Sequence, residues 1–321
     1  MQNTNKQNDG LVVILGTGGT IAGTAQDAAD NVGYRAAQLG VLELVRAIPP
    51  LAQRRLETEQ IAQLDSKDMD FATWQKLALR VSEHLARPEV MGVVITHGTD
   101  TLEETAYFLQ RVLAPSKPVV LTAAMRPATA LQTDGPQNLL DAVNVAAERQ
   151  AHGVLVVFAG AVHSAEQLRK VHSYRVDAFA SADGARAAVV EEGRVRWLSQ
   201  LNTARSPFGL GVLSRPPENW PRVQILMNYV GADGTVVEAL LRQGVDGLVV
   251  AGTGNGSLSL KLEIALRAAQ AQGVAVLRST RCDAGPVTES ADTLPSAGAL
   301  SPVKARVELL LNLLAALLAA K

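Results

Sequence analysis

Short apolar runs alternate along the chain with longer stretches in which apolar residues recur every three or four positions. Seven runs rich in β-branched residues predict buried strands, at Leu11–Leu15, Gly92–Thr96, Pro118–Ala123, Gly153–Phe158, Val223–Met227, Gly247–Ala251 and Val274–Arg278. Helical periodicity marks segments between them, such as LEETAYFLQRVL (102–113), NLLDAVNVAAERQ (138–150) and LKLEIALRAAQAQG (260–273). Apolar strands that alternate with helices predict an α/β fold, with a mainly parallel sheet and helices on both faces.

The alternation lapses once, in a segment that has four prolines and little periodicity, Ser199–Pro221. We therefore expect a linker at 199–221, a larger N-terminal α/β domain over 1–198 and a smaller C-terminal α/β domain over 222–321. The apolar run LLLNLLAALLAA (309–320) is too short to cross a bilayer. It predicts a buried terminal helix with Ser301 as N-cap and Pro302 as its first residue.

The charge and the content of cysteine and histidine limit the partners, cellular location and cofactors that we expect. The 321 residues include 30 Lys and Arg against 31 Asp and Glu, a formal net charge of -1, so we expect no nucleic acid or membrane partner. The single cysteine, Cys282, and a polar N-terminus without an apolar export segment favour a cytoplasmic location. The five histidines are scattered without metal-ligand spacing, so we expect neither a metal nor another cofactor.

The glycine-rich loop after the first strand, GTGGTIAG (16–23), does not match either common phosphate-binding motif. A dinucleotide fingerprint needs a third glycine where Ile21 stands, and a P-loop needs a lysine. The sequence therefore favours a nicotinamide-binding protein least. Thr20 in this loop is either an ordinary turn residue or a reactive hydroxyl.

A second buried strand ends in a similar way, in THGTDTLEETA (96–106), where Thr99 and Asp100 precede a helix. Asp100 could simply form a capping box with Glu103 at a helix that begins near Thr101. For His97 the simplest expectation is a structural hydrogen bond.

Two strand ends thus carry hydroxyl side chains, Thr20 and Thr99, the second beside a carboxylate. If the two strands are neighbours, both hydroxyls face one cleft at the carboxyl edge of the sheet, where such sheets bind ligands. A threonine hydroxyl becomes a nucleophile when a base takes its proton and a third group orients the base.

Together, TGGTIAG (17–23) and THGTDTLEETA resemble the bacterial L-asparaginase family, which includes the glutaminase-asparaginases. The two signatures occur in order, about eighty residues apart. Further similarity runs through DSKDM (65–69), AMRPATALQTDGPQNL (124–139), GTGNGS (252–257) and SPVKAR (301–306), so it covers nearly the whole chain.

The resemblance implies hydrolysis of the side-chain amide of L-asparagine, with some activity on L-glutamine, by double displacement. Thr20 matches the family's nucleophile. Tyr34, which follows the irregular segment Gly23–Gly33, matches a tyrosine on a loop that closes over the substrate. Thr99, Asp100 and Lys170 match the family's second catalytic cluster.

The resemblance also implies residues that bind the substrate. Thr99 and Asp100 belong to this set, with Asp100 pairing the α-amino group and Ser66 holding the α-carboxylate. Lys67 stands where the family usually has glutamine, and it either pairs with the α-carboxylate or points to solvent. Ser257 replaces an asparagine found in many relatives, which leaves room for a longer substrate such as glutamine.

In relatives, a glutamate from the neighbouring subunit reaches the site. The segment CDAGPVTESADTLPSAGAL (282–300) is compact here, and Glu289 or Asp292 could take this role. We prefer Glu289 because its side chain is longer, although both could be solvated loop acids. The resemblance implies a homodimer, paired into a homotetramer, in which Ser257 and Glu289 serve the partner's site.

Two other functions stay open on the same fold. One is an amidotransferase subunit that supplies ammonia. Such subunits carry an extra N-terminal domain, which we do not expect here because ten residues precede the first strand. The other is a non-catalytic module that binds an amino acid.

Overall fold

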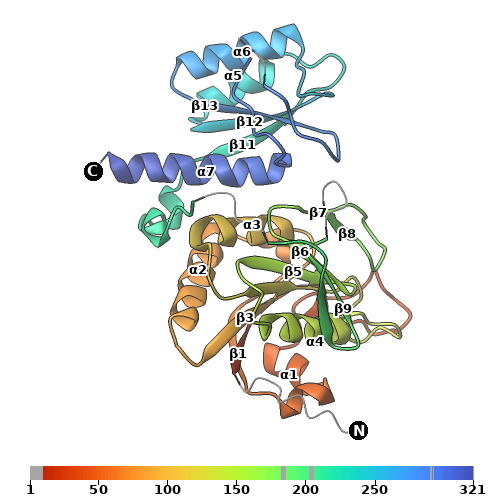
Figure 1. Cartoon of the computed structure of the whole chain (residues 1–321). Coiled ribbons are helices and arrows are strands. Elements are labelled where there is room, and N and C mark those ends of the chain that lie inside the picture. Colours follow the sequence, from red (N-terminus) through yellow and green to blue (C-terminus); the bar gives the residue numbers. More distant parts are fainter. Residues whose placement is uncertain (1–9, 182–185, 202–205, 290, 292, 321) are drawn as a thin grey trace. The chain divides into compact units, whose positions relative to one another are not determined.

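The chain divides between Pro207 and Phe208 into two units, Met1–Pro207 and Phe208–Lys321 (Figure 1). The computed structural model describes residues 10–181, 186–201, 206–289, 291 and 293–320. Within these residues, no helix has the length and apolar character that a membrane crossing requires. The division falls inside the segment 199–221.

An eight-stranded sheet forms the centre of the N-terminal unit, in the order β10-β9-β6-β5-β4-β3-β1-β2. Its parallel part consists of β2 (Leu56–Leu64), β1 (Leu11–Gly18), β3 (Val90–Thr96), β4 (Val119–Thr122) and β5 (Val154–Phe158). Antiparallel strands extend it, namely β6 (Ala161–Ser164), β9 (Ala188–Glu191) and β10 (Arg194–Trp197). The predicted mainly parallel sheet is confirmed.

Helices cover both faces of this sheet (Figure 1). The helices are α1 (Val41–Arg46), α2 (Phe71–Leu85), α3 (Leu102–Leu113) and α4 (Gly135–Ala146). Alternate residues of a strand point to opposite faces, so Val12 and Ile14 pack into one apolar cluster with α1 and α4. The other face carries α2 and α3, which meet where Trp74 stacks on Phe108 at 4.6 Å between ring centroids.

Two short strands, β7 (Leu168–Lys170) and β8 (Phe179–Ser181), form a separate antiparallel pair. Short 3-10 helices mark several turns, at η1 (Thr20–Ala22), η2 (Pro49–Gln53), η3 (Ser66–Asp68), η5 (Leu210–Leu213) and η6 (Pro217–Asn219). Of these, η1 and η3 follow β1 and β2 directly. They carry Thr20 and Ser66 to the carboxyl edge of the main sheet.

The C-terminal unit contains a three-stranded parallel sheet, β11 (Val223–Met227), β12 (Gly247–Gly252) and β13 (Ala275–Thr280). One face is covered by α5 (Thr235–Arg242) and α6 (Leu260–Ala271), and the other by α7 (Pro302–Ala319) (Figure 1). The side chain of Ser301 caps α7 by accepting a hydrogen bond from the backbone N–H of Lys304, as the sequence predicts.

Candidate active site

Three loops meet at one edge of the main sheet. β1 lies between β2 and β3 and is parallel to both, so the loops that follow all three strands reach the same edge. The two strands that end near Thr20 and Thr99 are therefore neighbours in the sheet, as the sequence analysis required. The carboxyl edge of a parallel sheet is where such folds bind ligands.

The main chains of these loops approach so closely that only glycine fits. Gly19 has φ +81, and a Cβ at this position would lie 2.4 Å from Cα of Gly98. A Cβ on Gly98 would lie 2.4 Å from Oγ of Ser66. Glycine removes both clashes and accepts the positive φ. Thr20 and Thr99 follow these two glycines directly. Both therefore extend from one surface of main-chain atoms, the glycine floor formed by Gly19 and Gly98.

Thr20 contacts the tyrosine that the resemblance pairs with it. Its side chain is almost buried, and its Oγ1 lies 2.6 Å from Oη of Tyr34. The intervening segment closes on itself because Thr24 and Arg35 exchange two backbone hydrogen bonds of 2.9 Å. The structure thus holds the Tyr34 hydroxyl against Thr20, and one hydrogen atom lies between the two oxygens.

The second cluster forms across a long stretch of sequence. Lys170 Nζ donates to Thr99 Oγ1 at 2.9 Å and to Asp100 Oδ1 at 2.7 Å. The Lys170 side chain is 20% exposed and that of Asp100 is 53% exposed, so the ion pair is only partly buried. A Thr99 oxygen that accepts from Lys170 keeps its own hydrogen available for another acceptor.

The capping box of Asp100 and Glu103 that the sequence suggested is wrong. α3 begins at Leu102, its N-cap is Thr101 rather than Asp100, and the Thr101 side chain makes no capping hydrogen bond. The Asp100 carboxylate instead binds the Lys170 ammonium, which is a stronger partner than a backbone N–H because it is charged.

Ser66 and Lys67 are adjacent in sequence but lie in different surroundings. Ser66 is buried, and its Oγ accepts a hydrogen bond from the backbone N–H of Asp100 at 3.1 Å. Lys67 is 61% exposed, and its Nζ lies 2.6 Å from Asp65 and 3.4 Å from Asp68. The hydrogen bond to Asp65 raises the pKa of Lys67. Ser66 therefore belongs to the loop cluster, whereas Lys67 is held at the surface by its own carboxylate neighbours.

The buried side chain of His97 contacts Gly98 of the glycine floor. It is fully buried, and its Nδ1 lies 2.7 Å from the carbonyl oxygen of Gly98, while Nε2 has no partner among the described residues. Burial lowers the pKa of His97 to about 4, so the ring is neutral at neutral pH. Nδ1 then donates to the Gly98 carbonyl. This is the structural hydrogen bond expected from the sequence.

The segment that carries Tyr34 also contacts the loop after β4. The backbone N–H of Ala128 donates to the Gly23 carbonyl at 2.9 Å, and the backbone N–H of Ala25 donates to Thr129 Oγ1 at 2.8 Å. Leu131 N–H donates to the carbonyl of Ala28 at 3.1 Å. These contacts hold the segment 23–28 against the loop 124–134.

Asp134 fixes the loop after β4 in turn. Its carboxylate accepts the backbone N–H groups of Met125 and Arg126 at 2.9 and 3.0 Å, and burial raises its pKa. In the sequence, only the family resemblance pointed to the stretch 124–139. The supporting role of Asp134 had one local indication, because this aspartate precedes Gly135 and Pro136 at the start of a helix.

The remaining predicted residues belong to the C-terminal unit. Ser257 exchanges two backbone hydrogen bonds with Thr253, of 2.7 and 3.0 Å, and lines a recess of about 310 Å³ together with Arg278. Glu289 is exposed, and its Oε1 accepts the backbone N–H of Ser296 at 3.1 Å. Asp292 lies outside the described residues. The structure thus places Ser257 and Glu289 in a different unit from Thr20.

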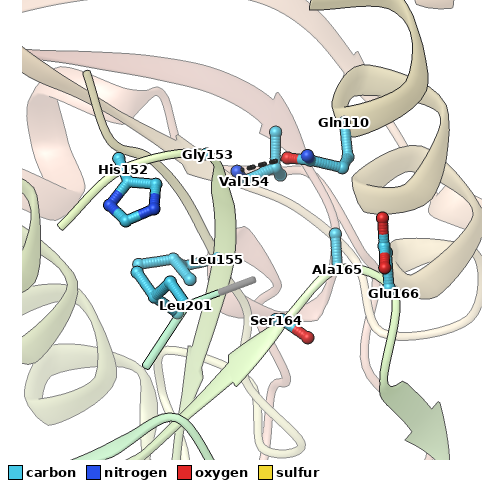
Figure 2. Close-up of a pocket in the computed structure, with 9 residues that line it drawn as sticks. All are labelled: Gln110, His152, Gly153, Val154, Leu155, Ser164, Ala165, Glu166 and Leu201. Carbon is cyan, nitrogen blue, oxygen red and sulfur yellow. Dashed lines mark hydrogen bonds between the residues drawn. The ribbon is translucent and has the colours of Figure 1, made fainter. Parts of the chain in front are cut away.

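A smaller pocket lies at the opposite edge of the main sheet, where β5 begins. Figure 2 shows Gln110 on α3, whose Oε1 accepts the backbone N–H of Val154 at 2.8 Å. The cavity beside this bond has about 20 Å³, enough for one water molecule. None of the candidate site residues lines it. The described residues also contain no group of three or more His, Cys, Asp or Glu side chains placed to bind a metal ion.

Comparisons with known proteins find two matching family models and several similar relatives. A family model described as "Asparaginase, N-terminal" matches residues 11–203, and one described as "Glutaminase/Asparaginase C-terminal domain" matches residues 222–318. The chain is 39% identical over 280 residues to the glutaminase-asparaginase of Pseudomonas fluorescens biotype A, and the aligned region covers 85% of this chain and 76% of that relative. It is 37% identical over 314 residues to L-asparaginase 2 of Escherichia coli (strain K12), covering 94% and 88%.

A solved structure is also similar. The crystal structure of a probable cytoplasmic L-asparaginase from Campylobacter jejuni superposes with a TM-score of 0.89 and 38% sequence identity, covering 95% of each chain. The similarity therefore extends through both units.

Proposed function

Since the chain belongs to the asparaginase family, we propose that it is an amidohydrolase that converts L-asparagine to L-aspartate and ammonia and accepts L-glutamine more weakly. The named relatives include both L-asparaginases and glutaminase-asparaginases. The observation that carries the proposal is the position of Thr20, with its Oγ1 2.6 Å from Tyr34 Oη on the floor that it shares with Thr99. No observation favours an amidotransferase subunit or a non-catalytic module.

Thr20 is the nucleophile in this proposal. Its Oγ1 attacks the side-chain amide carbon while its hydroxyl proton passes to Tyr34 Oη and the phenolic hydrogen of Tyr34 moves on toward the leaving nitrogen, so that the tyrosine stays neutral. Breaking the carbon–nitrogen bond transfers a proton to the leaving nitrogen, which departs as ammonia and leaves an acyl ester on Thr20. Water then cleaves the ester, which yields the free acid and restores the threonine hydroxyl.

Thr99 and Lys170 serve the proton transfers. Because the Thr99 oxygen accepts a hydrogen bond from Lys170, its own hydrogen is free to point toward the leaving nitrogen. Asp100 anchors the Lys170 ammonium and so fixes the direction of the bond to Thr99. Proton transfer by a positioned group of this kind typically accelerates a reaction by about 10²–10⁴-fold.

The substrate is a zwitterion, and the site offers partners for both of its charges. The half-exposed Asp100 carboxylate is suited to the α-ammonium, and the Ser66 hydroxyl to the α-carboxylate. We assign the direct hydrogen bond to Ser66 rather than to Lys67, since Lys67 Nζ is already bound by Asp65 and Asp68. This arrangement selects a free amino acid over a simple amide.

We further propose a homodimer, paired into a homotetramer, in which Ser257 and Glu289 of one subunit complete the Thr20 site of the partner. The support is the membership of the asparaginase family. We also propose a cytoplasmic location, which the single cysteine and the similar structure named as cytoplasmic support. Analytical ultracentrifugation and cell fractionation test these two points.

The decisive experiment measures ammonia release by the purified protein from L-asparagine, L-glutamine and an amide that lacks the α-groups. We expect the rates to fall in that order. Thr20→Ala should abolish turnover but keep the fold and asparagine binding, whereas the control Thr58→Ala on β2 should keep full activity. A wild-type protein that binds asparagine without releasing ammonia would refute the proposal in favour of a binding module.

A further inference from the structure

Among the proposed catalytic residues of the N-terminal unit, Lys170 is the one that does not extend from the main sheet or its immediate loops. It ends β7, and β7 and β8 form a sheet of only two strands. An isolated pair of short strands has little stability by itself. The place of the Lys170 ammonium therefore depends on what fastens this pair to the rest of the unit.

The register shows which face of the pair is fastened. Lys170 pairs with Phe179, and Leu168 pairs with Ser181. Directly opposite residues of an antiparallel pair point to the same side, so all four side chains share one face. Leu168, Phe179 and Ser181 are buried, so this face is the inner one.

One fastening is a buried hydrogen bond to the main sheet. Nδ1 of His163, on β6, lies 2.8 Å from Oγ of Ser181, and the residues are 1% and 7% exposed. Burial, together with the nearby Arg186 cation, lowers the pKa of His163 to about 4, so the ring is neutral at neutral pH. The bond therefore joins two neutral groups inside the protein. Neither group has a role in the proposed chemistry.

A second contact attaches the strand pair to the main sheet, two residues away from Ser181 along β8. The rings of Phe158, on β5, and Phe179 meet edge to face, with centroids 4.9 Å apart and an interplanar angle of 62°. Phe179 and Ser181 thus attach alternate positions of β8 to two neighbouring strands of the main sheet. Phe179 is the cross-strand partner of Lys170 itself.

We propose that His163 and Ser181 are positioning residues, whose hydrogen bond holds β8, and through it Lys170 on β7, at the distance from which Nζ reaches Thr99. This inference rests on the proposed function of the Thr99–Lys170 cluster. The hydrogen bond fixes the end of the strand pair, while the aromatic contact sets its separation from the sheet. Loss of the bond frees β8 to shift, and the Lys170 ammonium shifts with it.

Matched variants test the bond. His163→Leu and Ser181→Ala remove one partner each, whereas His163→Asn keeps a polar group near the place of Nδ1 and Ser181→Thr keeps the hydroxyl. A displacement of about 1 Å can cost up to roughly 100-fold in rate, so we expect the first two to lower kcat about 10–100-fold, with a much smaller change in KM. The other two should recover most of the loss. His152→Leu, at a half-buried histidine elsewhere in the unit, is the control.

A double mutant separates positioning from general damage. In a Lys170→Met background, His163→Leu should cause no further loss of kcat, because the residue acts through Lys170. Independent, multiplicative losses would overturn the proposal, as would full activity of His163→Leu in the wild-type background. An inactive wild-type protein would instead refute the proposed function. A crystal structure of Ser181→Ala then still decides positioning, by whether Nζ of Lys170 stays within hydrogen-bond reach of Thr99 Oγ1.

Discussion

The hydroxyl oxygens of Thr20 and Tyr34 lie 2.6 Å apart, although the two residues stand on either side of a thirteen-residue excursion of the chain. Thr20 belongs to η1 directly after β1, and Tyr34 returns to it through the backbone pairing of Thr24 and Arg35. At this distance the two oxygens act as one hydrogen-bonded unit. A change at either oxygen therefore alters the other.

Tyr34→Phe removes one oxygen and leaves the ring in place. We expect kcat for asparagine to fall by about 10²–10⁴-fold, the range for loss of a positioned proton acceptor. The melting temperature should stay unchanged, since the ring contacts persist. Steady-state kinetics and calorimetry measure both, and Tyr229→Phe at an exposed tyrosine is the control. Unchanged kcat would remove Tyr34 from the chemistry.

Gly98→Ala should damage stability and activity together. The new Cβ would meet Oγ and Cβ of Ser66 at 2.4 and 2.7 Å, so the loops must separate. Overpacking of this kind costs about 1–3 kcal/mol in the free energy of unfolding. Gly40→Ala is the control, because its Cβ would meet its nearest neighbour at 3.5 Å, and it should cost less than about 1 kcal/mol. Urea unfolding compares the two. Equal stability of both variants would contradict the close approach.

Lys67→Met tests whether this lysine binds the substrate carboxylate directly. Its ammonium is exposed and bound to Asp65 and Asp68, so we expect its removal to change KM for asparagine by less than about fivefold. A direct partner of the carboxylate would instead cost about 2–5 kcal/mol. A rise in KM above thirtyfold at unchanged kcat would therefore place Lys67 in the site.

Stability should fall as the pH drops below about 6.5, because His97 and His163 are buried in the neutral form. Each has a pKa of about 4 in the folded chain, against about 6.5 when unfolded, so the unfolded chain binds the extra proton first. Each histidine then removes up to about 1.4 kcal/mol of unfolding free energy per pH unit between these values.

His163→Asn isolates one of these contributions. The raised pKa values of Asp134 and Asp141 act in the opposite sense, since a carboxyl that binds its proton more tightly when folded loses stability as the pH rises. They are unchanged in the variant. Urea unfolding at pH 7 and pH 5 should therefore show a smaller loss in His163→Asn than in the wild type, and an equal loss would contradict the neutral buried ring.

Elements with strong periodicity could be predicted from the sequence. The stretch 102–113 is helical from its first residue to its last, because its apolar stripe continues throughout. The helix predicted at 138–150 instead spans Gly135–Ala146, since Gly135 and Pro136 form its first turn without an apolar pattern. The strand β2 was missed because its residues, LETEQIAQL, are mostly polar. It lies at the sheet edge, where one side of the strand faces solvent.

The candidate site was predictable where it follows long strands and not where it depends on distant pairing. Thr20 and Thr99 end buried strands, so their meeting follows from the order of the parallel sheet. Lys170 reaches Thr99 through β7 and β8, which have three residues each and no detectable alternation. The contact of the Tyr34 segment with the loop 124–134 is made largely by backbone groups, and these leave no mark in the sequence.

The bare main chain beneath the two threonines has an evolutionary consequence. A surface made of Gly19 and Gly98 has no side chain to shorten or lengthen, and a substitution that adds bulk there separates the loops. Descendants of this protein cannot adjust the size of the amide they accept from that direction. Divergence in substrate length must therefore arise from side chains that stand elsewhere around the site.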